Sequence, residues 1–110
     1  MAVDVSRLAV GGFSDGAGYA LALGVTNGDL FTNVIAWSPG YMRFPAERGS
    51  PRIFVSHGTQ DWVLPIDRCS RLLVPRLRAA GHDVYYREFD GLHTLPPELA
   101  RMAIEQLVNG

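Results

Sequence analysis

Three side chains in this 110-residue sequence have the chemistry of a nucleophile, a base and an orienting acid: Ser14, His93 and Asp61. A serine hydroxyl is a weak nucleophile near neutral pH, so it needs a base to accept its proton. The base in turn needs a carboxylate that fixes its tautomer and stabilises its charged form. These three residue types therefore suffice for nucleophilic catalysis, provided that the fold brings them together.

Ser14 lies at the centre of the segment Gly12-Phe13-Ser14-Asp15-Gly16, between a short apolar run and a segment of small residues. This Gly-x-Ser-x-Gly spacing is typical of a nucleophile elbow, in which a strand turns sharply into a helix and exposes the serine Oγ. We expect the glycines on both sides of the serine to supply the missing Cβ atoms that the turn requires. The alternative is a serine in an ordinary glycine-rich turn, because the chain has 12 glycines.

The elements that must position these residues follow from hydrophobic periodicity. Short apolar runs bounded by turn residues predict strands, and apolar residues at helical spacing predict helices. The resulting order, β-α-β-β-α-β-α, predicts a single α/β domain over 1–110, with a mostly parallel sheet of about four strands and flanking helices. The predicted strands are 7–11, 33–37, 52–57 and 83–89, and the predicted helices are 17–25, 65–80 and one that starts near 96–97.

Three segments have special features. Pro75 interrupts the predicted helix 65–80, so we expect a kink there or two shorter helical pieces. The strand 83–89 alternates polar and apolar residues, which indicates an edge strand. The segment 42–51 has no consistent period and is predicted to be a loop.

The three candidate catalytic residues each follow a predicted strand. Ser14 comes after the first strand, Asp61 after the third and His93 after the fourth. The carboxyl ends of parallel strands lie along one edge of a sheet, where ligands normally bind, so the three residues are expected to converge. Structural alternatives stay open, because an aspartate after a glycine turn is a common turn cap and a loop histidine is commonly a surface residue.

The other histidines and carboxylates receive structural interpretations. His57, at the end of the third strand, is interpreted as a hydrogen-bonded structural residue rather than a base. His82 follows Gly81 in a polar loop and is expected to be solvated. Two aspartates compete for the acid role but are better explained by a helix N-terminus and by a turn: Asp67 and Asp90.

Composition argues against several other classes of function. All ten basic residues are arginines, they are scattered, and the net charge is -1, so we expect no nucleic-acid and no membrane partner. The histidines lack paired ligand spacing and no phosphate-binding loop is convincing, so neither a metal nor a cofactor is expected. The single cysteine, Cys69, is expected to be a buried thiol. No signal-peptide pattern and no apolar run of roughly 20 residues occurs, so a cytoplasmic location is expected.

The motifs together resemble a known superfamily. Three segments carry the resemblance: GFSDG at 12–16, SHGTQDWVLP at 56–65 and GLH at 91–93. They follow the serine, acid, histidine order of the α/β-hydrolases, and the chain looks most like the carboxylesterases and dienelactone-hydrolase-like esterases, from about residue 7 to the last helix. The resemblance implies a serine ester hydrolase that forms an acyl-enzyme, with Ser14 as nucleophile, His93 as base and then acid, and Asp61 as orienting carboxylate.

The resemblance also implies that part of the usual fold is missing. Members of the superfamily usually have about eight strands, whereas here the elbow begins at residue 12, so the chain corresponds to the C-terminal half: a truncated or minimal α/β-hydrolase fold. One oxyanion donor is expected, the backbone N–H of Asp15, while the second donor, which precedes the elbow, is expected to be absent. Loss of one donor typically costs about a hundredfold to a thousandfold in rate. We therefore expect weak activity or a substitute donor, and the alternative is a catalytically silent binding or assembly module.

The missing strands also affect the expected assembly. In the superfamily the strand before the serine lies inside the sheet, so the predicted strand 7–11 becomes an apolar edge with unpaired backbone groups. We expect a homo-oligomer in which a second copy covers this edge, by pairing the two edge strands about a twofold axis.

Loop residues near the strand ends are expected to line a pocket for a small-molecule ester. Their apolar and aromatic character suits the acyl or alcohol part of a short-chain ester, and no lid insertion for a long-chain lipid is visible. For the two tryptophans, a place in the core or on the surface is the alternative. The candidate pocket residues are Phe13, Trp37, Ser38, Met42, Trp62, Val63, Leu64 and Leu95.

Overall fold

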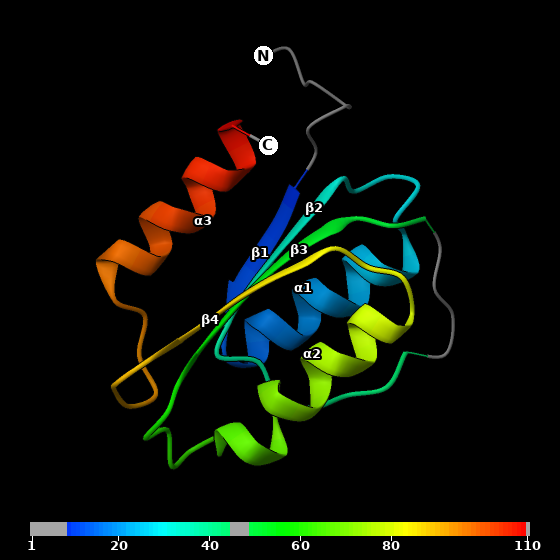
Figure 1. Ribbon diagram of the computed structural model, residues 1–110. Helices are drawn as coiled ribbons and strands as arrows, with labels where there is room; N and C mark the ends of the chain where they lie inside the picture. The colour runs from blue at the N-terminus through cyan, green and yellow to red at the C-terminus, as the bar shows by residue number, and fades with distance from the viewer. Residues whose placement is uncertain (1–8, 45–48, 110) are drawn as a thin grey trace.

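The computed structural model describes residues 9–44 and 49–109 (Figure 1). Its centre is a four-stranded sheet in which each pair of neighbouring strands is parallel and the spatial order is β1-β2-β3-β4. The prediction of an α/β fold with a parallel sheet of about four strands is thus confirmed. The strands are Ala9–Phe13 (β1), Asn33–Trp37 (β2), Arg52–Gly58 (β3) and Val84–Phe89 (β4).

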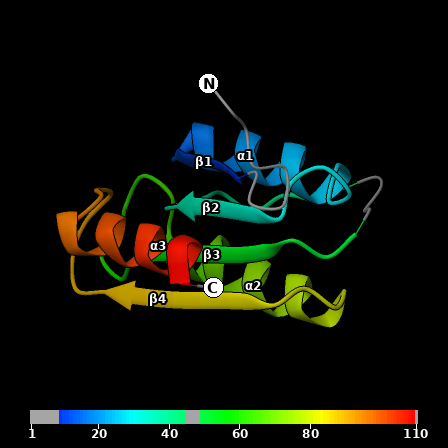
Figure 2. The same ribbon diagram turned by 90° about the horizontal axis from the view of Figure 1, so that it is seen from above.

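Helices cover both faces of the sheet. Helices α1 and α2 lie side by side on one face, and α3 lies on the other (Figures 1 and 2). A short 3₁₀ helix, η2, precedes α2. The bounds are Asp15–Thr26 (α1), Ile66–Arg68 (η2), Ser70–Ala79 (α2) and Pro97–Asn109 (α3).

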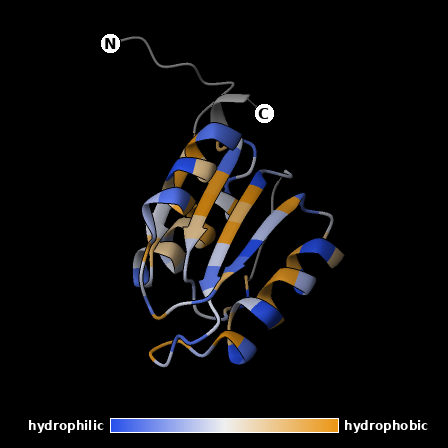
Figure 3. Ribbon diagram, turned by 60° about the vertical axis from the view of Figure 1, so that its left-hand side comes forward, coloured by the Kyte–Doolittle hydropathy of each residue, from blue (hydrophilic) through white to orange (hydrophobic). Residues whose placement is uncertain are grey.

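The strands contribute apolar side chains to a separate core on each face. Val34 and Ala36 of β2 pack with α1 and α2, whereas Ile35 and Trp37 pack with residues of α3. Because β2 is apolar on both faces, it reads as a continuous apolar run in the sequence, which is typical of a strand inside a parallel sheet. Helices α2 and α3 instead carry both hydrophilic and hydrophobic residues (Figure 3), because each packs on the sheet with one side only, whereas α1 is apolar over most of its length.

The first strand extends further than predicted. Residues 7 and 8 of the predicted strand 7–11 lie outside the described residues, as do residues 45–48 of the predicted loop 42–51. β1 continues past residue 11 because its parallel pairing with β2 extends to the pair Phe13 and Trp37. The strand therefore ends directly at the serine.

The predicted helix 65–80 consists of two helices, but the break lies at Cys69 and not at Pro75. Cys69 has φ -121° and ψ -100°, outside the helical region, and it separates η2 from α2. The buried hydroxyl of Ser70, which begins α2, lies 2.6 Å from Nδ1 of His57 in β3. Pro75 is exposed inside α2, where water can satisfy the carbonyl group that a proline leaves unpaired.

The prediction that His82 is solvated is wrong. His82 is only 6% exposed. Gly81, with φ +95°, reverses the chain after α2, and the backbone N–H of His82 donates to the carbonyl of Leu77 at 3.1 Å. This tight turn places the imidazole in the interior. The polar residues around His82 in the sequence therefore wrongly suggested that the side chain is exposed.

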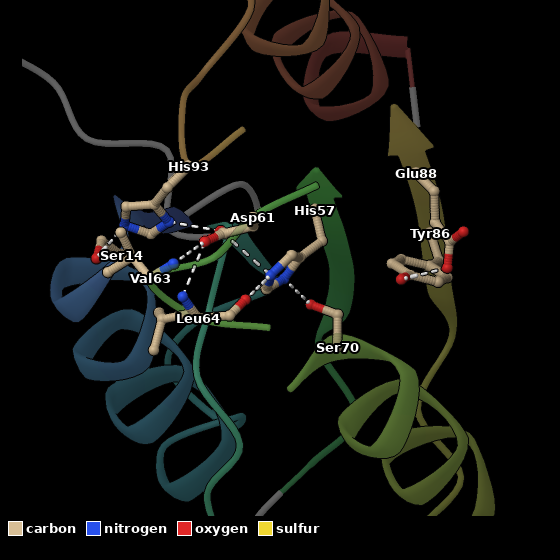
Figure 4. Close-up of polar contacts among 9 residues, drawn as sticks. All are labelled: Ser14, His57, Asp61, Val63, Leu64, Ser70, Tyr86, Glu88 and His93. Atoms are coloured by element: carbon tan, nitrogen blue, oxygen red, sulfur yellow. Dashed lines mark hydrogen bonds and ion pairs between the residues drawn. The ribbon is translucent and has the colours of Figure 1, made fainter. Parts of the chain in front are cut away.

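β4 forms one edge of the described sheet, as its alternating pattern predicts. Glu88 of β4 accepts two hydrogen bonds from Arg71 of α2, each 2.9 Å long. It accepts another from the hydroxyl of Tyr86 at 2.8 Å (Figure 4). The guanidinium of Arg71 above all, together with the Tyr86 hydroxyl, lowers the pKa of Glu88 to about 2. This two-pronged ion pair ties the edge strand to α2.

β1 forms the other edge, and among residues 9–44 and 49–109 it pairs with β2 alone. We propose that a second copy of the chain pairs along β1 about a twofold axis, because exposed strand edges are templates for association. Size-exclusion chromatography with light scattering is expected to give a particle of twice the 12.0 kDa chain mass. A clean monomer at high concentration would contradict this proposal.

Candidate active site

The turn from β1 into α1 has the geometry of a nucleophile elbow. Ser14 has φ 60° and ψ -118°, a conformation that non-glycine residues rarely adopt and that costs about 1–3 kcal/mol. The surrounding structure holds it there, since the N–H of Ser14 donates to the carbonyl of Trp37 at 2.9 Å and its own carbonyl accepts from Ala17 at 3.0 Å. The ordinary-turn alternative for the serine is therefore disfavoured.

The two glycines of the motif are not equivalent. A Cβ added to Gly12 would lie 2.3 Å from the carbonyl oxygen of Gly16, so the first turn of α1 can approach β1 only because Gly12 has no side chain. A Cβ added to Gly16 would meet no described atom within 4 Å. The expectation that both glycines are required for the turn is thus correct for Gly12 and wrong for Gly16, because only the strand side of the elbow is crowded.

Ser14, His93 and Asp61 meet at the carboxyl ends of the strands (Figure 4). Nε2 of His93 lies 2.8 Å from Oγ of Ser14, and Nδ1 of His93 lies 2.6 Å from Oδ2 of Asp61. They come from the turn after β1, the loop between β4 and α3, and the loop after β3. The ring of Phe13 lies 4.9 Å from the His93 ring, centroid to centroid. The three residues therefore converge, and their catalytic roles stay predictions.

The Asp61 carboxylate is fully buried and uses both of its oxygens. Oδ1 accepts the backbone N–H groups of Val63 at 3.0 Å and Leu64 at 2.8 Å, and Oδ2 accepts Nδ1–H of His93. The turn-cap alternative and the orienting-acid interpretation are thus compatible, because each uses a different oxygen. Since the carboxylate only accepts, the proton of neutral His93 lies on Nδ1, and Nε2 is left to accept the Ser14 proton.

The other titratable residues near the strand ends have structural contacts. His57 is fully buried between Oγ of Ser70 and the carbonyl of Leu64, which agrees with the predicted structural role, and burial lowers the pKa of His57. Cys69 is buried as predicted, and burial raises the pKa of its thiol, which opposes a nucleophilic role. Asp67 forms an exposed ion pair with Arg71 at 2.6 Å.

A cavity of about 360 Å³ lies beside Ser14. Its walls are the first turns of α1, the loop after β2 and one residue of the loop after β3. The residues that line it are Ser14, Asp15, Gly18, Tyr19, Ala22, Gly40, Tyr41, Met42 and Leu64. Most of these side chains are apolar or aromatic, so the cavity suits an apolar group attached to a carbonyl carbon at Ser14.

Of the eight predicted pocket residues, Met42 and Leu64 line this cavity and the others lie elsewhere. Trp37 packs beneath α3, where its Nε1–H donates to the carbonyl of Leu99 at 3.4 Å. The remaining positions are Phe13 against His93, Ser38 in the interior, Trp62 and Val63 exposed on the loop surface, and Leu95 half-buried before α3.

Helix α1 contributes a wall that the loop-based prediction missed. Asp15, Gly18, Tyr19 and Ala22 follow the spacing i, i+3, i+4, i+7, which places them on one face of a helix. Tyr19 is a large side chain in a helix that otherwise consists mainly of small residues, and it is 69% exposed. A helical wheel started at the residue after Ser14 would have found this face.

One oxyanion donor fits the predicted position. Asp15 is the first residue of α1, so its backbone N–H has no acceptor within the helix and lies at the positive end of the helix dipole. Asp15 also lines the cavity beside Ser14. In the part of the chain that the structure describes, no group of three or more histidine, cysteine, aspartate or glutamate residues could hold a metal ion.

Comparison with solved structures places this arrangement among known folds. The chain superposes on esterase PE8 with a TM-score of 0.82, at 26% identity, over 92% of this chain and 49% of that one. It matches the Bacillus cereus carboxylesterase with a TM-score of 0.79, at 20% identity, over 96% of this chain and 51% of that one. For Zea mays acyl-protein thioesterase 2 the TM-score is 0.71, at 18% identity, over 90% of this chain and 54% of that one.

The chain has a partial α/β-hydrolase fold. It spans about half the length of each of these three structures. No protein-family model and no curated protein sequence matches it. In the α/β-hydrolase fold a serine, an acid and a histidine follow strand ends in this chain order, as Ser14, Asp61 and His93 follow β1, β3 and β4 here. Within the described ranges, no helix has both the length and the apolar character of a membrane span.

Proposed function

We propose that the chain is a serine carboxylic-ester hydrolase that acts on short-chain esters through an acyl-enzyme on Ser14. One observation carries the proposal: the continuous hydrogen-bond chain from Ser14 Oγ through His93 to Asp61, with lengths of 2.8 Å and 2.6 Å. A serine in a strained turn, or a hydrogen-bonded aspartate and histidine pair, would by itself not indicate catalysis. Together, at one edge of the sheet, the nucleophile, the base and the orienting acid are the groups that acyl transfer requires.

The proposed reaction has two halves. Ser14 Oγ attacks the ester carbonyl carbon while its proton passes to Nε2 of His93, and the Asp61 carboxylate stabilises the resulting imidazolium. The backbone N–H of Asp15 stabilises the negative oxygen of the tetrahedral intermediate. His93 then protonates the departing alkoxide, which leaves an acyl group on Ser14. Water, deprotonated by His93, attacks that acyl group, and His93 returns the proton to Ser14 Oγ as the bond to the acyl carbon breaks, which releases the acid and restores the serine.

The cavity supports a small, apolar substrate. Its volume of about 360 Å³ and its lining of tyrosine, methionine and leucine side chains suit a short acyl or alcohol group. The names of the similar structures, an esterase, a carboxylesterase and an acyl-protein thioesterase, support hydrolysis at an acyl carbon. Ester hydrolysis is the simplest reaction consistent with both.

The second candidate is a catalytically silent binding or assembly module. The observation that favours it is the coverage of the similar structures, of which the chain spans about half. In the superfamily the second oxyanion donor precedes the elbow, so a chain without that donor would retain the three residues and lose much of the rate.

Covalent labelling with a fluorophosphonate separates the two candidates. The parent chain is expected to take up one phosphonyl group per chain on Ser14, because the His93 base activates that hydroxyl. Ser14→Ala should take up none and should not hydrolyse p-nitrophenyl acetate. Tandem mass spectrometry locates the adduct, and Ser38→Ala serves as a matched control that should label like the parent. An unlabelled parent supports the silent module, and equal hydrolysis by Ser14→Ala excludes the proposed mechanism.

A further inference from the structure

A second histidine lies against the Asp61 carboxylate, on the side away from Ser14. Nε2 of His57 is 3.3 Å from Oδ2 of Asp61, the same oxygen that His93 contacts (Figure 4). Both the His57 and Asp61 side chains are fully buried. The described reaction gives this imidazole no task.

The partners of His57 determine which nitrogen carries its proton. Nε2 lies 2.7 Å from the carbonyl oxygen of Leu64, which only accepts, so Nε2 must donate. Burial lowers the pKa of His57 and thus favours the neutral ring. In a neutral ring Nδ1 then accepts a hydrogen bond from the hydroxyl of Ser70, at 2.6 Å. The Leu64 carbonyl therefore selects the tautomer with the proton on Nε2, and the Ser70 hydroxyl holds the ring from its Nδ1 side.

This Nε2–H closes the turn that orients the carboxylate. The N–H of Leu64 donates to Oδ1 of Asp61 at 2.8 Å, while the carbonyl of Leu64 accepts from His57. Both backbone groups of Leu64 are thus hydrogen-bonded, the N–H to Asp61 and the carbonyl to His57. Oδ2 of Asp61 lies between the imidazoles of His93 and His57. Without His57, the carbonyl of Leu64 would lose this hydrogen-bond donor, and Oδ2 of Asp61 would lose the imidazole that lies against it on the side away from His93.

We propose that His57, oriented by Ser70, is a positioning residue that holds Asp61 in the rotamer in which Oδ2 faces His93. The inference rests on the proposed function for its effect on rate, but the orientation of Asp61 can be measured without turnover. His57 does not touch the reacting atoms. It acts through Asp61, and its hydrogen bond to Leu64 also fixes one wall of the cavity beside Ser14.

The test compares His57→Leu, which removes both ring nitrogens, with His57→Gln, whose amide N–H can occupy the place of Nε2–H. For His57→Leu, kcat per fluorophosphonate-titrated active site is expected to fall roughly tenfold to a hundredfold with KM little changed. His57→Gln is expected to restore most of kcat, and Ser70→Ala to give an intermediate loss. His82→Leu, which replaces a buried histidine outside the site, is the matched control and should keep the parental kcat per active site.

Proton NMR provides a readout that does not need activity. The Nδ1–H proton of His93, hydrogen-bonded to Asp61, is expected to give a slowly exchanging downfield signal in the parent and in His57→Gln. The signal should broaden or disappear in folded His57→Leu and weaken in Ser70→Ala. A parental signal with parental kcat in His57→Leu would overturn the proposal. If His57→Leu does not fold, the same parental behaviour in Ser70→Ala overturns it. A parent that shows the signal but no labelling rejects the esterase function, and loss of the signal in folded His57→Leu then still supports the positioning role.

Discussion

Asp61→Asn is expected to lower kcat for ester hydrolysis roughly ten-thousandfold, the cost of the wrong histidine tautomer in a serine triad. The asparagine oxygen will face the N–H groups of Val63 and Leu64, which need an acceptor, so its NH₂ group will face His93. A donor at that place forces the His93 proton onto Nε2. The nitrogen that should accept the Ser14 proton is then already protonated.

The measurement is the single-turnover rate of acylation, monitored through the p-nitrophenol that this step releases. This rate can be measured even when turnover is slow. Asp67→Asn is the matched control, because it makes the same carboxylate-to-amide change in an exposed ion pair with Arg71. It should keep the parental rate, since exposed pairs contribute little. Comparable losses in both variants, or none in Asp61→Asn, would show that Asp61 is not the acid.

Gly58→Ala is expected to damage both activity and stability. A Cβ at Gly58 would lie 2.3 Å from the carbonyl oxygen of Leu92 and 2.5 Å from that of Gly91, so the backbone that leads to His93 must move. Displacement of a catalytic group by about 1 Å can cost roughly a hundredfold in rate. Forcing a methyl group into a closely packed place typically costs about 1–3 kcal/mol of unfolding free energy.

Chemical denaturation and acylation kinetics measure the two effects together. Gly16→Ala is the control, because it adds the same methyl group where no described atom lies within 4 Å. That change in a helix is expected to raise the unfolding free energy by up to about 1 kcal/mol, since alanine favours the helix over glycine. Parental acylation in Gly58→Ala would mean that the loop carrying His93 tolerates the shift.

The fold class was accessible from the sequence because its signals are local. Continuous apolar runs in β2 and β3, and the alternating pattern of β4, reflect how many faces of each strand are buried. The convergence of Ser14, Asp61 and His93 was also accessible, because parallel strands place their carboxyl ends together. Neither inference required knowledge of any individual side-chain contact.

Other features depended on contacts that local patterns do not encode. The break before α2 lies at Cys69, next to Ser70, which bonds to a histidine 13 residues earlier, and no local helix signal reports such a bond. The burial of His82 likewise follows from the return of the chain at Gly81. Met42 and Leu64 were among the predicted pocket residues, but Gly18, Tyr19 and Ala22 were missed because the prediction considered loops, whereas these three belong to α1.

The order of the strands and helices, the elbow at Ser14 and the candidate residues at three strand ends could be predicted because they follow from residue type and spacing. The use of the Asp61 carboxylate depends on tertiary contacts. One oxygen caps its own turn, and the other lies between His93 and His57, which approach from different segments of the chain. Hydrogen bonds form between groups that are close in space, and residues far apart in the sequence come close only once the sheet has formed.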